Sequence, residues 1–274
     1  MNRTRRPLIA LLLAAAVAMT GCDDDDEIEY VLAWSDEFDA PAGTPPNPDN
    51  WTYDLGTGCP NLCGWGNNEL QNYTDRPENV AHDGEGHLVI TAREESFGES
   101  DYTSARIRTE GLFSQRYGRF EARIKLPRGQ GIWPAFWMLG DDIRSVGWPQ
   151  CGEIDVMELL GQTPDTVYGT VHGPGYSGGQ SIGQTYQLAN ADFDAGFHVF
   201  AVEWTESRIT WFVDGEAYHR VRPQDLGNRE WVFDDPFFLI LNVAVGGNFP
   251  GNPDESTRFP QTMTIDWVRV YRAQ

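Results

Sequence analysis

The chain consists of short strand-like segments separated by glycine- and proline-rich turns, and it has no long amphipathic helical pattern. The strand-like segments are residues 88–93, 118–126, 198–204, 208–213 and 263–271. They alternate in character and are rich in β-branched and aromatic residues, which is typical of half-buried strands. Many short strands joined by turns predict an all-β sandwich or barrel, in which the long polar loops carry the function.

One domain accounts for most of the chain. Asp214-Gly215 between two strand-like runs is a strong hairpin signal, because both residues tolerate a positive φ. Neither an internal repeat nor a second low-complexity linker follows Tyr30. Because 40% of the residues are hydrophobic, the chain can bury a sizeable core. We therefore expect a single domain over residues 31–274.

The acidity of the chain limits its partners. Its formal net charge is −21 at pH 7. A strongly negative surface repels polyanions, which argues against nucleic acid and acidic polysaccharides and leaves a neutral polymer as a compatible partner. Solubility or adaptation to salt explains the same charge equally well.

The first thirty residues have the features of export. Arginines precede an apolar run at residues 8–19, which is too short to span a bilayer comfortably. Small residues then lead to Cys22, as in a bacterial lipoprotein signal in which this cysteine becomes lipidated; an ordinary signal peptide is the alternative. We expect a signal peptide over residues 1–21 and an acidic tether over 22–30, which starts with Cys22 and an aspartate run. The protein is then exported, and a lipid on Cys22 is its contact with a membrane.

The remaining cysteines fit an exported protein. Cys59 and Cys63 lie close together in a loop rich in glycine, proline and asparagine, where a disulfide is expected in an oxidising compartment. Cys151 is then left over. A zinc site is a weaker alternative, because no second cysteine or histidine pair stands at ligand spacing.

Residues 152–160 have the apolar positions of a strand, but three acidic residues interrupt them. In a regular strand Glu153 and Asp155 share one face and Glu158 lies on the other. A single β-bulge at residues 156–157 shifts the phase by one residue, so that all three acids lie on one face. The sequence therefore predicts a bulged strand with three carboxylates along one groove.

Three acids on one face are electrostatically unfavourable unless they have a role. Retaining glycosidases use two carboxyl groups about 5–5.5 Å apart, one as nucleophile and one as acid/base. The like-charged neighbours raise one pKa and keep one glutamate protonated as the acid, while Asp155 holds the nucleophile in place. An acidic edge strand or a metal site is the alternative, although edge protection does not explain the flanking apolar residues.

Residues 153–158 resemble the signature of glycoside hydrolase family 16 in its bulged form. Further segments resemble the laminarinase branch of this family, and together they cover nearly the whole chain from Trp34 onward. They are residues 64–69, 104–108, 133–138, 169–173 and 265–271. The shorter, unbulged pattern of the carrageenase-like and xyloglucan-acting branches is absent from this sequence.

The resemblance implies a fold and a set of roles. The fold is a concanavalin-like β-jelly roll, a sandwich of two antiparallel sheets with the substrate cleft on the concave sheet. The nucleophile is Glu153, the acid/base is Glu158, and Asp155 assists them. The implied activity is endo-hydrolysis of β-1,3-glucan with retention, without a cofactor for catalysis.

Aromatic residues offer a platform for sugars. Trp133 and Trp137 alternate with Pro134, Phe136 and Met138, so a strand places both indoles on one face. Flat indoles beside an acidic groove suit the C–H faces of pyranose rings. Core packing is the alternative, because tryptophan is usually largely buried.

Polar residues complete the predicted binding site. Asn67 and Asn68 lie in a glycine-rich loop where side-chain amides can bind sugar hydroxyl groups. Turn formation is the alternative for Asn68, and the resemblance implies substrate binding for Asn67. Arg106 is a candidate donor to hydroxyls, with a salt bridge to the acids as the alternative. His172 is placed near the catalytic pair by the resemblance, and Asn242 in an apolar strand needs a buried partner or a ligand.

The resemblance also implies a structural calcium ion away from the catalytic groove. Asp266 interrupts the last strand, where an aspartate of the family helps to bind Ca²⁺ through hard oxygen ligands. Backbone oxygens near Glu37 and Gly84 are the further ligands that we expect. A surface residue on a polar face is the alternative for Asp266.

The leading function is therefore an endo-1,3-β-glucanase that acts on a neutral β-glucan as a monomer. A mixed-linkage β-1,3-1,4-glucanase or a galactan- or agar-cleaving relative is the neighbouring hypothesis. A non-catalytic glucan-binding lectin on the same sandwich is a hypothesis from another class. Loss of one glutamate would mark such a lectin, and this sequence keeps both Glu153 and Glu158.

Overall fold

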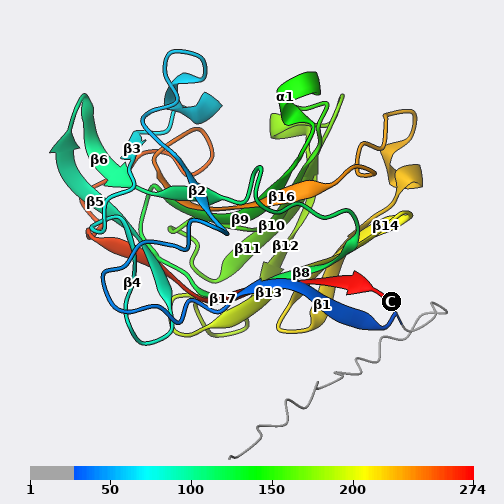
Figure 1. Ribbon diagram of the computed structural model, residues 1–274. Coiled ribbons are helices and arrows are strands. Elements are labelled where there is room, and N and C mark those ends of the chain that lie inside the picture. Colours follow the sequence, from blue (N-terminus) through cyan, green and yellow to red (C-terminus); the bar gives the residue numbers. More distant parts are fainter. Residues whose placement is uncertain (1–27) are drawn as a thin grey trace, which may run out of the picture.

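The computed structural model describes residues 28–274, which form two β-sheets packed face to face (Figure 1). The predicted signal peptide, Cys22 and most of the acidic tether lie outside these residues. The all-β sandwich expected from the strand-like segments is confirmed, and the two layers are those of a jelly roll. Among the described residues, no helix is both long and apolar enough to cross a membrane.

The larger sheet joins the two ends of the described chain. Within residues 28–274, the ten-stranded sheet contains β15 (Glu216–Val221), β14 (Arg208–Val213), β13 (His198–Thr205), β8 (Gly118–Lys125), β17 (Gln261–Ala273), β5 (Leu88–Phe97), β6 (Ser100–Ser104) and β3 (Gln71–Tyr73) in this order, with β1 (Tyr30–Asp36) beside β17 and β4 (Val80–His82) beside β5. Because β1 pairs antiparallel with the last strand, the start of the domain is held to its end.

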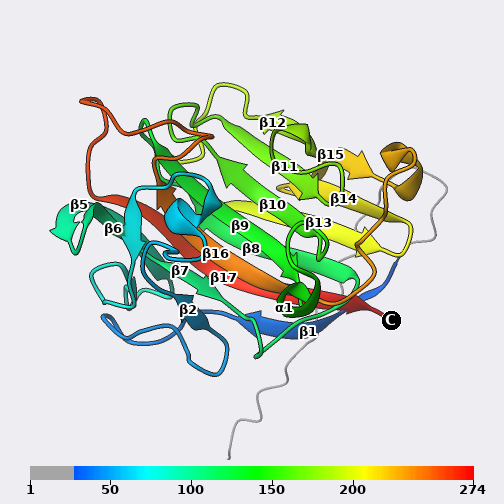
Figure 2. The same ribbon diagram turned by 90° about the horizontal axis from the view of Figure 1, so that it is seen from above.

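The smaller sheet is antiparallel throughout. In the described part of the chain, its seven strands are β12 (Ile182–Gln187), β11 (Thr166–His172), β10 (Glu153–Leu159), β9 (Ile132–Gly140), β16 (Phe237–Val245), β7 (Arg106–Arg108) and β2 (Thr52–Asp54). Short helical turns complete the structure: η1 (Cys63–Gly66), α1 (Ile143–Val146), η2 (Gly178–Gln180) and η3 (Pro223–Leu226). Both η1 and α1 stand over the side of this sheet that faces away from the larger sheet (Figures 1 and 2).

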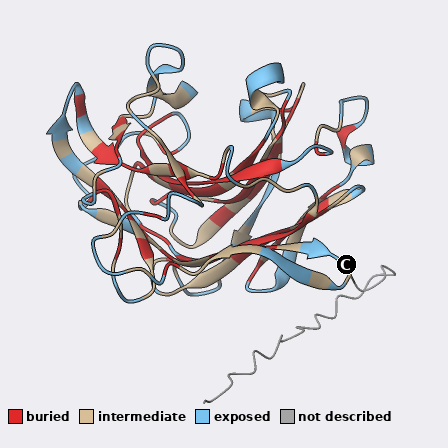
Figure 3. Ribbon diagram, in the orientation of Figure 1, coloured by how far each residue is buried: buried red, intermediate tan, exposed pale blue. Residues whose placement is uncertain are grey.

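The main core lies between the two sheets, and buried residues line both layers (Figure 3). Alternate residues of β5, such as Leu88 and Ile90, point into this core, as their period-2 pattern predicts. Every residue of β16 is buried, because side chains and loops also cover its outer face. We call this outer face of the seven-stranded sheet the site face.

The predicted hairpin is confirmed between β14 and β15. Asp214 and Gly215 form its turn with φ angles of 49° and 84°, as two-residue hairpin loops require. The cysteines also follow the first alternative: Cys59 and Cys63 form a disulfide, and Cys151 is free and buried. The zinc alternative for the paired cysteines is therefore wrong.

Candidate active site

A bulge interrupts β10 at the predicted position. Against β11, Asp155 pairs with Thr170 and Glu158 with Tyr168, so residues 156 and 157 together face one residue. Against β9, the register shifts between Asp155 and Met157. The bulged strand therefore carries one extra residue, which changes the alternation of side chains beyond it.

The extra residue divides the strand between two environments. Four apolar side chains of β10 belong to the main core: Ile154, Val156, Met157 and Leu159. Consecutive Val156 and Met157 both enter the core, which a regular strand does not allow. Glu153, Asp155 and Glu158 consequently lie together on the site face, as predicted.

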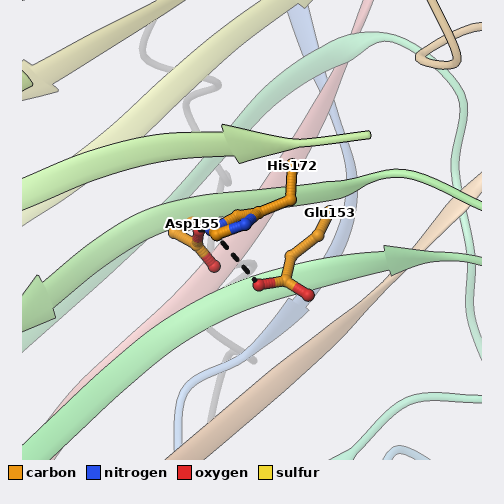
Figure 4. Close-up of side chains that lie close together, drawn as sticks. All are labelled: Glu153, Asp155 and His172. Atoms are coloured by element: carbon orange, nitrogen blue, oxygen red, sulfur yellow. Dashed lines mark ion pairs between the residues drawn. The ribbon is translucent and has the colours of Figure 1, made fainter. Parts of the chain in front are cut away.

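Asp155 and Glu153 meet a histidine from the neighbouring strand. Figure 4 shows Glu153 and Asp155 of β10 converging with His172 of β11. The Nε2 atom of His172 lies 3.1 Å from Asp155 Oδ2 and 3.7 Å from Glu153 Oε1. One ligand atom from each residue lies within 4.8 Å of the other two, so this group could also hold a cation. The predicted place of His172 beside the acids is what the structure has.

The proton of His172 is fixed by its second nitrogen. The backbone N–H of Gly178 donates to His172 Nδ1 at 3.1 Å, so the proton of the ring lies on Nε2, toward Asp155. Burial lowers the pKa of His172, but the hydrogen bond and charge of Asp155, with the charges of both glutamates, outweigh burial and raise the pKa to about 9. Because Nε2 carries the proton and lies near both acids, it has no lone pair to offer to a metal ion shared with them.

Burial and mutual repulsion govern the two glutamates. Burial first, and the charge of Asp155 second, raise the pKa of Glu153 to about 8. The same causes, with the charge of Glu153, raise the pKa of Glu158 well above its ordinary value. The site therefore holds protons at neutral pH, which is the condition for a carboxylic acid to act as a proton donor.

Each glutamate accepts a hydrogen bond from an indole. Trp148 Nε1 donates to Glu153 Oε2 at 2.7 Å, and Trp133 Nε1 donates to Glu158 Oε1 at 3.0 Å. The two tryptophans come from different segments, the loop after α1 and strand β9. These bonds orient the two carboxyl groups separately, and each stabilises the ionised form of its glutamate.

The predicted aromatic platform is on the site face. Trp133 and Trp137 are each partly exposed, whereas Phe136 and Met138 between and beside them lie in the core. Trp137 Nε1 donates to Asn242 Oδ1 at 2.7 Å, and Asn242 in turn donates to Tyr73 Oη at 3.1 Å. Asn242 therefore has the buried partners that its apolar strand demanded, and it fixes the plane of the Trp137 ring.

Arg106 lies across the sheet from these residues and pairs with an acid of another strand. Its Nε atom lies 2.8 Å from Asp54 Oδ2 on β2, not beside the acids of β10 as the salt-bridge alternative had it. Its guanidinium group stacks on Trp137 at 4.6 Å and on Trp65 at 5.0 Å. The pair holds Arg106 flat between two indoles, and its charge still lowers the pKa of Glu153.

Asn67 lies in the loop that follows η1. Its side chain donates to Glu69 Oε1 at 3.2 Å, and its carbonyl accepts the backbone N–H of Asn248 at 2.7 Å. The next residue, Phe249, packs edge-on against Trp133 at 5.6 Å between ring centroids. The structure thus brings Asn67 into a pair of loops that adjoin the platform tryptophan and Glu158.

Comparisons with known proteins agree with this geometry. The family model described as Glycosyl hydrolases family 16 matches residues 67–269, which is well over half of the chain. The chain belongs to glycosyl hydrolase family 16. A β-glucanase of Rhodothermus marinus is 44% identical over 98% of this chain and 94% of its own length.

Other members of family 16 are similar over most of the domain. A glucan endo-1,3-β-glucosidase A1 of Niallia circulans is 40% identical over 89% of this chain, which spans 38% of that longer protein. The catalytic domain of an endo-1,3-β-glucanase (laminarinase) from Thermotoga petrophila is 52% identical, with a TM-score of 0.86 over 90% of this chain and 99% of that one.

Sequence reasoning missed two aromatic residues of this family 16 site. Trp148, 47% exposed, bonds Glu153, and Phe249, 42% exposed, packs on Trp133 and Tyr168. Both lie in loops, where a strand periodicity gives no direction to a side chain. An exposed tryptophan five residues before Glu153 was the available signal, because exposed aromatics near a polar groove are typical of binding surfaces.

The predicted calcium ligands lie away from this site. Both carboxylate oxygens of Glu37 accept hydrogen bonds from Arg269, at 3.0 and 2.7 Å. The backbone oxygen of Glu37 is therefore its candidate ligand for calcium. Asp266 forms an ion pair with Arg123, and His87 Nε2 lies 3.9 Å from it. The carboxylate of Asp266 would therefore have to exchange Arg123 for the ion, with backbone oxygens near Glu37 and Gly84 as the further ligands. Calcium at Glu37, Gly84 and Asp266 stays a prediction.

Proposed function

We propose that this protein is an endo-acting β-1,3-glucanase that works with retention of configuration. The observation that carries the proposal is the bulge in β10, which places Glu153 and Glu158 on one face with Asp155 between them. Two carboxyl groups on one face suit a double displacement, in which one attacks and the other transfers the proton.

The contacts of each glutamate support its role. Glu153 accepts the Trp148 N–H and lies 3.7 Å from the proton-bearing Nε2 of His172, and both favour its ionised form as nucleophile. Glu158 lies beside the charges of Asp155 and Glu153, which favour its protonated form as acid. Asp155 lies between the two glutamates, 3.1 Å from His172 Nε2, where it assists both roles.

The reaction then has two steps. In the first, Glu158 gives its proton to the glycosidic oxygen while Glu153 forms a bond to the anomeric carbon, and the leaving chain departs with a free hydroxyl group. In the second, Glu158 takes a proton from water, the hydroxide oxygen bonds the same carbon, and Glu153 leaves as a carboxylate. Two inversions give net retention.

A β-1,3-glucan is the substrate that fits best. The site offers partly exposed indoles for pyranose faces and the Asn67 amide for hydroxyl groups, and the net charge of −21 disfavours acidic polymers. The names of the family members compared above, a β-glucanase, a glucan endo-1,3-β-glucosidase and an endo-1,3-β-glucanase, support the same substrate.

Two measurements on the purified enzyme test this proposal. On laminarin, lichenan and agarose in parallel, we expect reducing ends to appear fastest from laminarin, with products of several sizes from the first minutes. Proton NMR of the first products should show the β-anomer before mutarotation. Initial α-anomer would refute retention, faster cleavage of lichenan or agarose would refute the linkage, and binding of laminarin without cleavage would favour the lectin.

Export and anchoring are also proposed. We propose that Cys22 is lipidated and holds the domain at the cell envelope as a monomer. We also propose that calcium stabilises the fold near Asp266. The lipoprotein-like run that ends at Cys22 supports the lipidation of this cysteine.

Metabolic labelling with a fatty-acid analogue should mark the wild type and not Cys22→Ser. Sedimentation should give one chain, and added CaCl₂ should raise the melting temperature of the wild type but not of Asp266→Asn.

A further inference from the structure

A tryptophan of the opposite sheet reaches the bulge of β10. Trp211, on β14 of the ten-stranded sheet, is fully buried, and its indole Nε1 donates to the backbone carbonyl of Asp155 at 2.8 Å. This carbonyl belongs to the peptide between Asp155 and Val156, which is the first peptide of the bulge. The Trp211 side chain therefore spans the core between the two sheets and donates to the backbone of the catalytic strand.

The space for the indole comes from the residue opposite the bulge. Gly169 of β11 lies between the pairs that Thr170 and Tyr168 form with β10. A Cβ atom on Gly169 would lie 2.5 Å from Trp211 Cδ1 and 2.3 Å from Tyr218 Oη. Any other residue at this position would push away the edge of the indole that carries Nε1.

The opposite sheet is itself shaped for this contact. The register of β14 and β15 shifts between Trp211 and Phe212, which leaves Tyr218 as an extra residue on β15. The His219 ring lies against the Trp211 ring at a tilt of 31°, with 4.8 Å between centroids, so it packs against the indole. Two irregular strand pairs thus face each other across the core, with Trp211 between them.

The hydrogen bond from Trp211 gives the Asp155 carbonyl a partner at the bulge. A bulge disrupts the ladder locally, and a buried carbonyl without a partner costs about 1–3 kcal/mol. If this carbonyl loses the indole N–H, the extra residue gains freedom to shift along β10. Since side chains alternate with period 2, any such shift moves Glu158 relative to Glu153.

We propose that Trp211 is a positioning residue, whose indole N–H fixes the catalytic bulge and thereby the separation of Glu153 and Glu158. This inference rests on the proposed roles of the two glutamates. It assigns Trp211 no contact with the substrate, because the residue is buried between the sheets and the substrate binds on the site face.

A matched pair of variants tests the proposal. Trp204 is also fully buried in the same core, and its Nε1 donates to a backbone carbonyl, that of Phe233, at 3.0 Å. Trp211→Phe and Trp204→Phe therefore remove the same ring area and the same kind of hydrogen bond, and we expect similar losses in melting temperature. The kcat on laminarin should fall about tenfold or more in Trp211→Phe, with KM nearly unchanged, and stay within about twofold of wild type in Trp204→Phe.

The pH profile gives a second readout that plain destabilisation does not move. Loosening the bulge separates Glu158 from the negative charges that raise its pKa, so the basic limb of kcat should move to lower pH in Trp211→Phe only. Equal kcat values in the two variants, or an unmoved basic limb, would overturn the inference.

Isosteric replacement covers the case in which Trp211→Phe does not fold. Benzothienylalanine at position 211 keeps the bicyclic shape and removes only the N–H donor, so the same loss in kcat is expected. A wild-type kcat with this side chain would refute the role of the bond. Absence of activity in the wild type itself would refute the proposed function instead, so the two failures are distinguishable.

Discussion

The irregular strands β10 and β17 both carry an acid at the register shift, and the surroundings of that acid are opposite in the two strands. In β10 the bulge at residues 156–157 places Glu153, Asp155 and Glu158 on one face, with the proton-bearing Nε2 of His172 3.1 Å from Asp155. In β17 the register shifts between Ile265 and Trp267, and the extra residue, Asp266, pairs with Arg123.

The consequences for the pKa values are opposite as well. Burial and like charges raise the pKa values of Glu153 and Glu158. Near β17, the hydrogen bonds from Arg269 lower the pKa of Glu37. Glutamates on the site face therefore have raised pKa values, whereas Glu37, beside the opposite sheet, has a lowered one. Raised pKa values of this kind are typical of catalytic acids.

The largest expected difference concerns turnover. Glu153→Gln should lower kcat on laminarin by about 10³-fold or more, because the amide is no nucleophile. Asp266→Asn, its counterpart in β17, should keep kcat within about twofold, since Asp266 lies on the other sheet. Initial rates with matched protein concentrations measure both. Similar losses in the two variants would show that the contrast between the strands is not catalytic.

The next difference concerns the pH dependence of the residual activity. Asp155→Asn removes the charge that contributes most, after burial, to the raised pKa of Glu158. Glu158 should then lose its proton at lower pH, and the basic limb of kcat should move to lower pH, with kcat itself reduced by up to about 10²-fold. A pH–rate profile of this variant is the measurement, and a limb that moves to higher pH would contradict the account.

The free energy of unfolding should depend on pH through the raised pKa of Glu153. The folded pKa of Glu153 is raised, so the wild type loses stability as pH rises from the ordinary value of a glutamate toward about 8. Glu153→Gln escapes this loss and should be more stable at pH 8 by roughly 1 to 3 kcal/mol, with no gain near pH 4. Thermal unfolding at both pH values tests this, and an equal gain at both would argue against titration.

The smallest effect should come from the paired acids. The pKa of Glu37 is lowered, so its stabilisation is present above the ordinary pKa of a glutamate and lost as pH falls through the folded value. Because the pair is partly exposed, Glu37→Gln should cost only about 0.5 kcal/mol at pH 7 and nothing at pH 3. Denaturant unfolding at the two pH values checks it, and a loss that persists at pH 3 would show that packing dominates.

The periodicity of the strand-like segments predicted most of the fold. The alternation in residues 88–93 and 263–271 located β5 and β17, because one face of each is buried and the sequence must show it. The bulge in β10 also followed from the sequence, since three acids on one face required a phase shift that only an extra residue supplies.

Loops and cross-sheet contacts were beyond the sequence. Trp148 and Phe249 reach the site from loops, whose directions no periodicity sets. Arg106 lies beside Trp137, but its partner Asp54 comes from a strand that follows no strong pattern. Trp211 read as a core residue, because its contact with Asp155 depends on how the two sheets stack.

The central claim is that the bulge of β10 makes Glu153 the nucleophile of a two-carboxylate site. Trapping the enzyme with a 2-deoxy-2-fluoro β-1,3-glucosyl fluoride and mapping the labelled peptide by mass spectrometry tests it most directly. We expect one covalent sugar adduct, on Glu153. An adduct on Glu158 or Asp155, or turnover by an enzyme that never forms one, would contradict it.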